Sequence, residues 1–188
     1  MSSNEGSHKG HDRSLEIARS VIDSQDHGRR LSALREKSDI QKKIIEECRQ
    51  VLHHRDGTGF EDLIYINTMT GEVRRQTGYE REREVKPTEP MRRLLEKAEE
   101  HTVIAIHNHP GSTVPSPADI RSMVAHKYKY GLVIGHDGSL FRYSSVDGYD
   151  PVQYYYAWAH LDKNGYSTET FQVFIAEALL AGIALEVL

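Results

Sequence analysis

The chain has 188 residues, a formal net charge of −4, 28% charged residues and 38% hydrophobic residues. This length and composition suit a globular domain of ordinary size with additions at its ends. The slightly acidic balance excludes a broad cationic surface, so we expect no nucleic-acid partner. Cys48 is the only cysteine, which excludes an internal disulfide and a cysteine-based zinc ribbon and fits a reducing compartment such as the cytoplasm.

Residues 1–37 are predicted to form an N-terminal extension. The first 13 residues are polar and contain His8 and His11, and they have no apolar stretch of the secretory-signal type. Helical apolar spacing follows over residues 14–22 and begins again near Leu31, with a turn expected at 26–28. We therefore expect a solvated tail followed by two short helices.

Residues 38–145 are predicted to form the core. Ser38-Asp39 is a helix-start pattern, and apolar residues then recur at helical spacing until His53-His54-Arg55. The segments that follow read as strands or helices according to their apolar period and the turns between them. The expected strands cover 60–67, 72–85 (one or two strands), 102–107, 131–135 and 139–144, and the expected helices cover 90–100 and 120–128. The order α-β-β-α-β-α-β-β predicts an α/β (α+β) fold with a mixed sheet flanked by helices.

Residues 146–188 are predicted to form a helical C-terminal extension. One helix is expected over 151–162, and a second is expected from Ser167-Thr168 through Leu188. The second is strongly apolar, but Gln172, Glu177 and Glu186 interrupt it. Its uninterrupted apolar runs are far shorter than the roughly 20 residues of a membrane span. We expect no membrane association, and we expect residues 171–188 to be the route to any homo-oligomer.

The segment from Val103 to Asp119 carries the chemistry. An apolar run leads into His107-Asn108-His109, and residues i and i+2 of a strand share one face. His107 and His109 should therefore offer two imidazoles to one ion, and Asp119 returns a carboxylate at the start of the next helix. Two nitrogens, one carboxylate oxygen and an open position are typical of a catalytic zinc site. Ser116-Pro117-Ala118-Asp119 is also a helix-capping pattern, and the two roles are compatible.

The sequence H-N-H-P-G-S-T-V-P-S-P-A-D resembles the motif of JAMM/MPN+ (JAB-like) zinc metallopeptidases, most closely their bacterial and phage RadC-like branch. The family pattern is an upstream glutamate, then His-x-His, seven residues, Ser, two residues and Asp. Here six residues, 110–115, separate His109 from Ser116. The resemblance covers about residues 38–145 and implies an MPN/JAB-like, cytidine-deaminase-like fold.

The resemblance also implies a role for each matching residue. His107, His109 and Asp119 would bind one Zn²⁺ per chain, and Ser116 would stabilise the developing oxyanion. The general base would be a glutamate on the first strand after the first core helix. Glu61 fits best, with Glu72 as the rival and the Glu80–Glu84 run as a further alternative.

The implied activity is hydrolysis of a peptide or isopeptide bond in a protein or peptide substrate, which in this family is often a ubiquitin-like modifier. Three alternatives stay open. The first is a non-catalytic MPN-type scaffold or a phage or mobile-element assembly protein, and the second is a RadC-like protein linked by name to DNA repair. The third is another zinc hydrolase, although the two cysteines of the deaminase pattern are missing.

Overall fold

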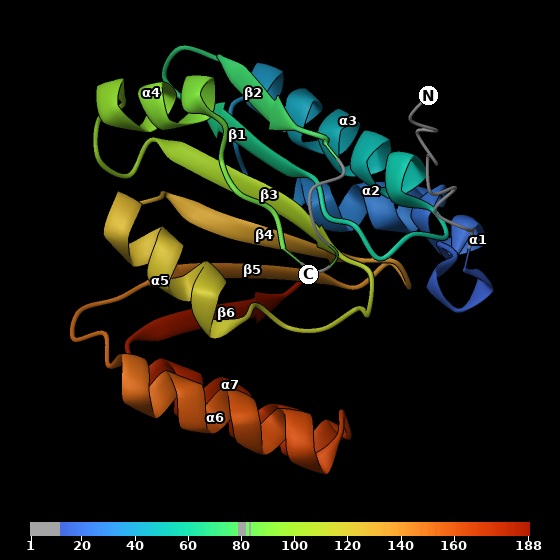
Figure 1. Cartoon of the computed structure of the whole chain (residues 1–188), viewed down its shortest axis with the longest axis vertical. Coiled ribbons are helices and arrows are strands. Elements are labelled where there is room, and N and C mark those ends of the chain that lie inside the picture. Colours follow the sequence, from blue (N-terminus) through green and yellow to red (C-terminus); the bar gives the residue numbers. More distant parts are fainter. Residues whose placement is uncertain (1–11, 79–81, 83) are drawn as a thin grey trace, which may run out of the picture.

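The computed structural model describes residues 12–78, 82 and 84–188. Its centre is a six-stranded mixed sheet with helices on both faces (Figure 1). The strand order is β2-β1-β3-β4-β5-β6; β3 and β4 are parallel, and the other neighbours are antiparallel. The strands are β1 (Leu63–Asn67), β2 (Val73–Gln76), β3 (Val103–His109), β4 (Tyr130–Gly135), β5 (Leu140–Ser145) and β6 (Ile183–Val187).

The helices divide between the two faces of the sheet (Figure 1). One face is covered by α3 and α2, and the other by α4, α5 and the α6–α7 hairpin. Their bounds, with a short 3₁₀ turn at Arg13–Leu15, are α1 (Arg19–Ile22), α2 (Gln25–Ser32), α3 (Ser38–Arg55), α4 (Glu89–Lys97), α5 (Pro117–His126), α6 (Pro151–Asn164) and α7 (Thr168–Leu180). The order of elements predicted for residues 38–145 is therefore confirmed, as is the mixed α/β class.

Two separate apolar clusters fill the two sides of the sheet. Because side chains alternate along a strand, β3 sends Val103 and Ala105 into the cluster under α5 and α6, and Ile104 and Ile106 into the cluster under α3. β3 is buried along its whole length, since it lies inside the sheet between β1 and β4. The last residues of β3 therefore lie in a fixed and desolvated position.

The predicted C-terminal helix through Leu188 is wrong beyond Leu180. Helix α7 ends at Leu180, and residues 183–187 form β6, which pairs with β5 in the central sheet. Gly182 makes the break, because it adopts φ +80° and a Cβ there would lie 2.7 Å from the backbone nitrogen of Tyr149. Beyond it, Ile183 and Leu185 are buried while Glu186 is exposed, which is the alternation of a strand.

Three further element predictions are corrected. Residues 26–28 lie inside α2, where Ser24 caps the helix by accepting the N–H of His27, so they are not a turn, and the helix predicted to begin near Leu31 begins at Gln25. The return is not one continuous strand, because β2 ends at Gln76 and residues 77 and 78 are not in a strand; residues 79–81 and 83 of the predicted range lie outside the described residues. The first core strand begins at Leu63, so Glu61 lies in the loop before β1 and not on the strand. His8, His11 and Glu80 lie outside the described residues.

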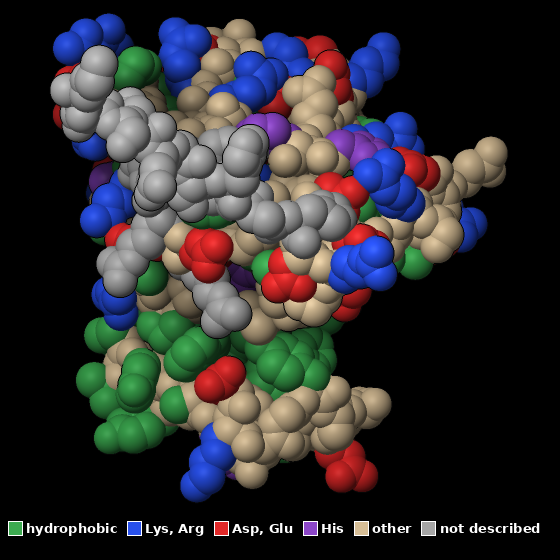
Figure 2. Space-filling model, turned by 45° about the vertical axis from the view of Figure 1, so that its right-hand side comes forward, with side chains coloured by type: hydrophobic (Ala, Val, Ile, Leu, Met, Phe, Trp, Pro, Cys, Tyr) green, Lys and Arg blue, Asp and Glu red, His purple; other side chains and the backbone are tan. Residues whose placement is uncertain are grey.

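Hydrophobic side chains are exposed along the α6–α7 hairpin, where they gather in the lower part of Figure 2. They include Val152, Tyr155 and Tyr156 on α6, and Leu179 and Leu180 on α7. Among the described residues, no helix combines the length and the apolar character that crossing a membrane requires. Self-association through this end of the chain stays a prediction.

Candidate metal centre

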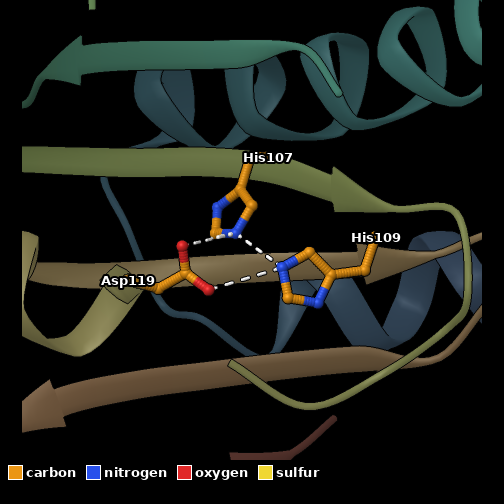
Figure 3. Close-up of side chains that lie close together, drawn as sticks. All are labelled: His107, His109 and Asp119. Atoms are coloured by element: carbon orange, nitrogen blue, oxygen red, sulfur yellow. Dashed lines mark hydrogen bonds and ion pairs between the residues drawn. The ribbon is translucent and has the colours of Figure 1, made fainter. Parts of the chain in front are cut away.

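The carboxyl end of β3 places the two histidines of the motif side by side. His107 and His109 are 4% and 7% exposed, and their side chains leave the same face of the strand (Figure 3). The two Nε2 atoms lie 3.0 Å apart, with ring centroids 4.8 Å apart. The prediction that both imidazoles point the same way is therefore confirmed.

The first turn of α5 supplies the carboxylate. Ser116 is the N-cap: its Oγ accepts the N–H of Asp119, while Asp119 Oδ2 accepts the backbone N–H of Ser116 at 2.7 Å. The Ser116 hydroxyl also donates to the same Oδ2 at 2.7 Å. This reciprocal capping box fixes the orientation of the carboxylate. Asp119 Oδ1 then faces His107 Nε2 at 3.3 Å, and Oδ2 lies 3.4 Å from His109 Nε2.

These three residues form a cluster that could hold one metal ion. The two Nε2 atoms lie 3.0 Å apart, and each lies 3.3–3.4 Å from one oxygen of the Asp119 carboxylate. Two imidazole nitrogens and one carboxylate are a donor set that transition-metal ions accept. The short loop before Ser116 therefore does not keep Asp119 from the imidazoles.

The loop after β3 also fixes the protonation of His109. Nδ1 of His109 lies 2.9 Å from the carbonyl oxygen of Thr113 and 3.0 Å from its hydroxyl. A carbonyl only accepts, so the ring proton belongs on Nδ1, and Nε2 keeps a lone pair toward the candidate ion. Such an outer hydrogen bond orients a metal-binding histidine and makes it a better ligand.

The charge of Asp119 and the charge of His109 shift each other's pKa. Burial lowers the pKa of His109, but Asp119, together with the charge of Glu61, outweighs burial and raises it overall. Burial raises the pKa of Asp119, yet the two histidines hold it well below its usual range. Asp119 is thus an anion between two imidazoles, which is the state that attracts a cation.

A cavity of about 640 Å³ opens beside the three ligands. Glu61 and Ser116 line it, so the candidate ligands, the candidate oxyanion donor and the candidate base share one space. The lining also includes Tyr65, whose hydroxyl lies 2.7 Å from that of Tyr128. Burial raises the pKa of both phenols, so these hydroxyls stay neutral.

The rival bases are separated by their positions. Glu72 pairs with Arg74 and lines a different cavity of about 320 Å³ beside α4. Glu84 pairs with Lys86 at 3.1 Å and does line the large cavity. Glu61 has the further property that its charge contributes to the raised pKa of His109. The structure thus places Glu61 and Glu84 in the cavity with the candidate ligands and Glu72 in another.

Sequence reasoning missed one buried polar residue at the site. Asn108 lies between the two histidines, is fully buried, and points to the opposite face of β3, toward His136 and the loop before β1. A polar residue at an inward position of a buried strand was the available signal. The sequence around His136 indicates only a hairpin turn, yet His136 is 2% exposed and in contact with Asn108.

In comparisons with known proteins, no family model, curated protein or solved structure matches this chain.

Proposed function

We propose that this chain is a zinc-dependent peptidase or isopeptidase of the JAMM/MPN+ type, with an MPN/JAB-like core. The observation that carries the proposal is the set of three contacts of 3.0, 3.3 and 3.4 Å among His107, His109 and Asp119 beside a cavity. Two imidazoles and one carboxylate suit zinc, and three protein ligands would leave a position open, as catalytic sites do. The motif's resemblance to that family supports the same reading.

The chain's own residues supply what hydrolysis needs. When bound, zinc lowers the pKa of a bound water to about 7 and polarises a substrate carbonyl. Glu61, which lines the same cavity, would accept the proton of the attacking water and deliver it to the leaving amine.

Ser116 would provide the oxyanion contact. Its hydroxyl donates to Asp119 Oδ2 in this structure and lines the cavity. Rotation of this hydroxyl toward a substrate carbonyl would stabilise the negative charge that develops on the oxygen. Single donors of this kind contribute about 2.7–4 kcal/mol in comparable sites. Asp119 keeps the backbone N–H of Ser116 when the hydroxyl turns, so the carboxylate stays in place.

The proposed substrate is a protein or peptide, with ubiquitin-like conjugates as the first to examine. Purified protein should contain stoichiometric zinc and cleave members of a panel of ubiquitin-like fusions, isopeptide-linked conjugates and peptides, and a chelator should stop the cleavage. Absence of bound zinc after incubation with the metal would refute the metal site. Zinc without cleavage of any member would favour the non-catalytic scaffold or assembly protein.

Glutamine variants test the base. We expect Glu61→Gln to abolish all but a small residual turnover while zinc stays bound, because the amide cannot accept the proton and Glu61 is not a candidate ligand. Glu72→Gln is the matched control and should keep full activity, since Glu72 lies outside the cavity. Loss of turnover in Glu84→Gln, with turnover retained in Glu61→Gln, would move the role to Glu84.

A further inference from the structure

Asn108 connects the strand of the candidate ligands to the loop that carries Glu61. Its Oδ1 accepts the backbone N–H of Asp62 at 2.8 Å, and its Nδ2 donates to the carbonyl oxygen of Phe60 at 3.1 Å. Phe60 and Asp62 are the two neighbours of Glu61. One side-chain amide therefore holds the backbone immediately before and immediately after the candidate base.

The two hydrogen bonds of the Asn108 side chain take the place of backbone pairing between β3 and the residues before β1. The β1–β3 pairing begins at Leu63, opposite His107, and the chain before Leu63 is not part of the ladder. Phe60 and Asp62 are nevertheless buried, at 4% and 1% exposure, so their backbone groups need partners inside the protein. Asn108 supplies one acceptor and one donor, which attach the loop to β3 without extending the strand.

His136 fixes which way the Asn108 amide faces. Nδ1 of His136 lies 2.6 Å from the carbonyl oxygen of Leu15, so the ring proton belongs on Nδ1. Nε2 then has a lone pair and accepts from Asn108 Nδ2 at 3.2 Å. Both amide hydrogens are used, on Phe60 and on His136, and Oδ1 is left to face Asp62. If the amide were flipped, its NH₂ group would face the N–H of Asp62, which is also a donor. Its oxygen would face the Phe60 carbonyl and the His136 lone pair, so all three hydrogen bonds would be lost.

The N-terminal segment supports the same loop from outside. The carbonyl oxygen of Leu15 accepts from His136 and also from the N–H of Gly57, at 3.2 Å. The backbone N–H of Ile17 donates to Asp56 Oδ1 at 2.9 Å. The segment therefore touches the 56–62 loop directly as well as through His136 and Asn108. All these contacts lie across the sheet from the metal ligands, because Asn108 points to the face opposite His107 and His109.

We propose that Asn108, oriented by His136, is a positioning residue for Glu61. This inference rests on the proposed function, because it assumes that Glu61 is the base. Asn108 is not a candidate ligand and does not itself line the cavity, so it acts by holding the Glu61 backbone at a fixed distance from β3. A displacement of about 1 Å at a reacting group can cost about 100-fold in rate. Asn108 would therefore affect proton transfer more than binding of metal or substrate.

The first experiment measures the attachment itself. In metal-free full-length Asn108→Ala, we expect hydrogen exchange at the Asp62 amide to accelerate at least about tenfold, while amides in the β3–β4 ladder stay protected. The matched control is Asn67→Ala. Asn67 is also buried and lies at the opposite end of β1, where its Oδ1 accepts the N–H groups of Met69 and Thr70 at 2.9 and 3.1 Å. The control should leave Asp62 protected.

The second experiment measures the consequence. With zinc stoichiometry unchanged, Asn108→Ala should lower kcat about 10- to 100-fold with KM within about threefold of wild type. Asn67→Ala should keep its kcat. In a Glu61→Gln background, Asn108→Ala should cause no further loss of the residual turnover, because a positioning effect requires the group that is positioned. His136→Leu should also lower kcat. It is the variant to measure if Asn108→Ala does not fold.

The outcomes separate this inference from the proposed function. A wild-type protein that binds no zinc or cleaves no substrate refutes the proposed function and the catalytic role of Glu61 with it. An active wild type whose Asn108→Ala and His136→Leu variants keep full kcat refutes only the positioning role. The positioning role is also refuted if Asn67→Ala lowers kcat as much as Asn108→Ala does. It is refuted as well if Asn108→Ala lowers kcat in the Glu61→Gln background by the same factor as in wild type. Unchanged exchange at Asp62 in Asn108→Ala refutes the attachment itself.

Discussion

Replacing Asp119 with asparagine should remove metal binding without unfolding the protein. Oδ2 of Asp119 accepts two hydrogen bonds from Ser116, one from the backbone N–H and one from the hydroxyl. In Asp119→Asn only the amide oxygen can accept the backbone N–H, so it must take the place of Oδ2. The amide NH₂ then takes the place of Oδ1 and faces His107 Nε2, now at 3.3 Å. A ligand atom is thereby exchanged for a donor that points at the cation.

The size of the effect follows from these contacts. Loss of an outer hydrogen-bond partner of a ligand typically costs about 10- to 100-fold in metal affinity. Here the ligand atom itself is lost, so we expect zinc affinity to fall more than about 100-fold, or about 2.7 kcal/mol. The helix cap is largely retained, since the amide oxygen still accepts from Ser116. The lost charge near the helix N-terminus costs about 0.3–1 kcal/mol of stability. The lost attraction between Asp119 and the two imidazoles adds to this cost in the metal-free protein.

Competition with a chromophoric chelator near neutral pH measures the affinity, and thermal unfolding of the metal-free proteins measures the stability. Asp150→Asn is the matched control, because Asp150 caps α6 by accepting the N–H groups of Val152 and Gln153 at 2.9 and 3.0 Å. Asp150 is no part of the candidate ligand cluster, so the control should bind zinc as wild type does. Zinc affinity in Asp119→Asn that stays close to that of wild type would refute the assignment of Asp119 as a ligand.

Three further predictions concern stability. Burial, followed by the charges of nearby arginines, lowers the pKa of His27 to about 4. Because the folded protein disfavours the charged imidazole, the free energy of unfolding should be largest above about pH 6.5. It should fall by at most about 3 kcal/mol as the pH drops to about 4. In His27→Leu, urea titrations should show a smaller decrease over the same pH range. Gly131→Ala should destabilise by about 1–3 kcal/mol, because the added Cβ would lie 2.0 Å from Tyr143 Cζ; an unchanged melting temperature would contradict this. Arg55→Met should cost about 3–5 kcal/mol of unfolding free energy by leaving Asp62 buried without its guanidinium partner, and a loss under about 1 kcal/mol would show that His54 suffices.

The segment from β3 into α5 is predictable because its pattern is local. The period of two places His107 and His109 on one face, and a serine, a proline and an aspartate within four residues mark the helix start. Both rules act over a few neighbouring residues, so one sequence suffices to apply them. The candidate ligands can therefore be identified from the sequence, whereas the distances between them cannot.

The parts that sequence reasoning missed depend on distant partners. The contact of Asn108 with Asp62 spans 46 residues of sequence, and that of His136 with Leu15 spans 121. The spacing of residues within a helix or strand therefore cannot predict these contacts. The short apolar run of β6 suits a helix as well as a strand, and its pairing with β5 decides between them. The sequence also indicates a turn at Gly28, although its φ is not positive and Ser24 starts a helix around it.

The two apolar clusters on the two sides of the sheet have a consequence for how this protein tolerates change. They have no residue in common, so substitutions under α3 and substitutions under α5 should add independently in their effects on unfolding. Stability could then be raised on the α3 side, and sequence could drift there, with the metal face unaltered. Asn108 is the exception, because it belongs to the α3 side by its contacts and to the metal strand by its backbone. Of the two faces, the one without the ligands would therefore tolerate repacking everywhere except around this amide.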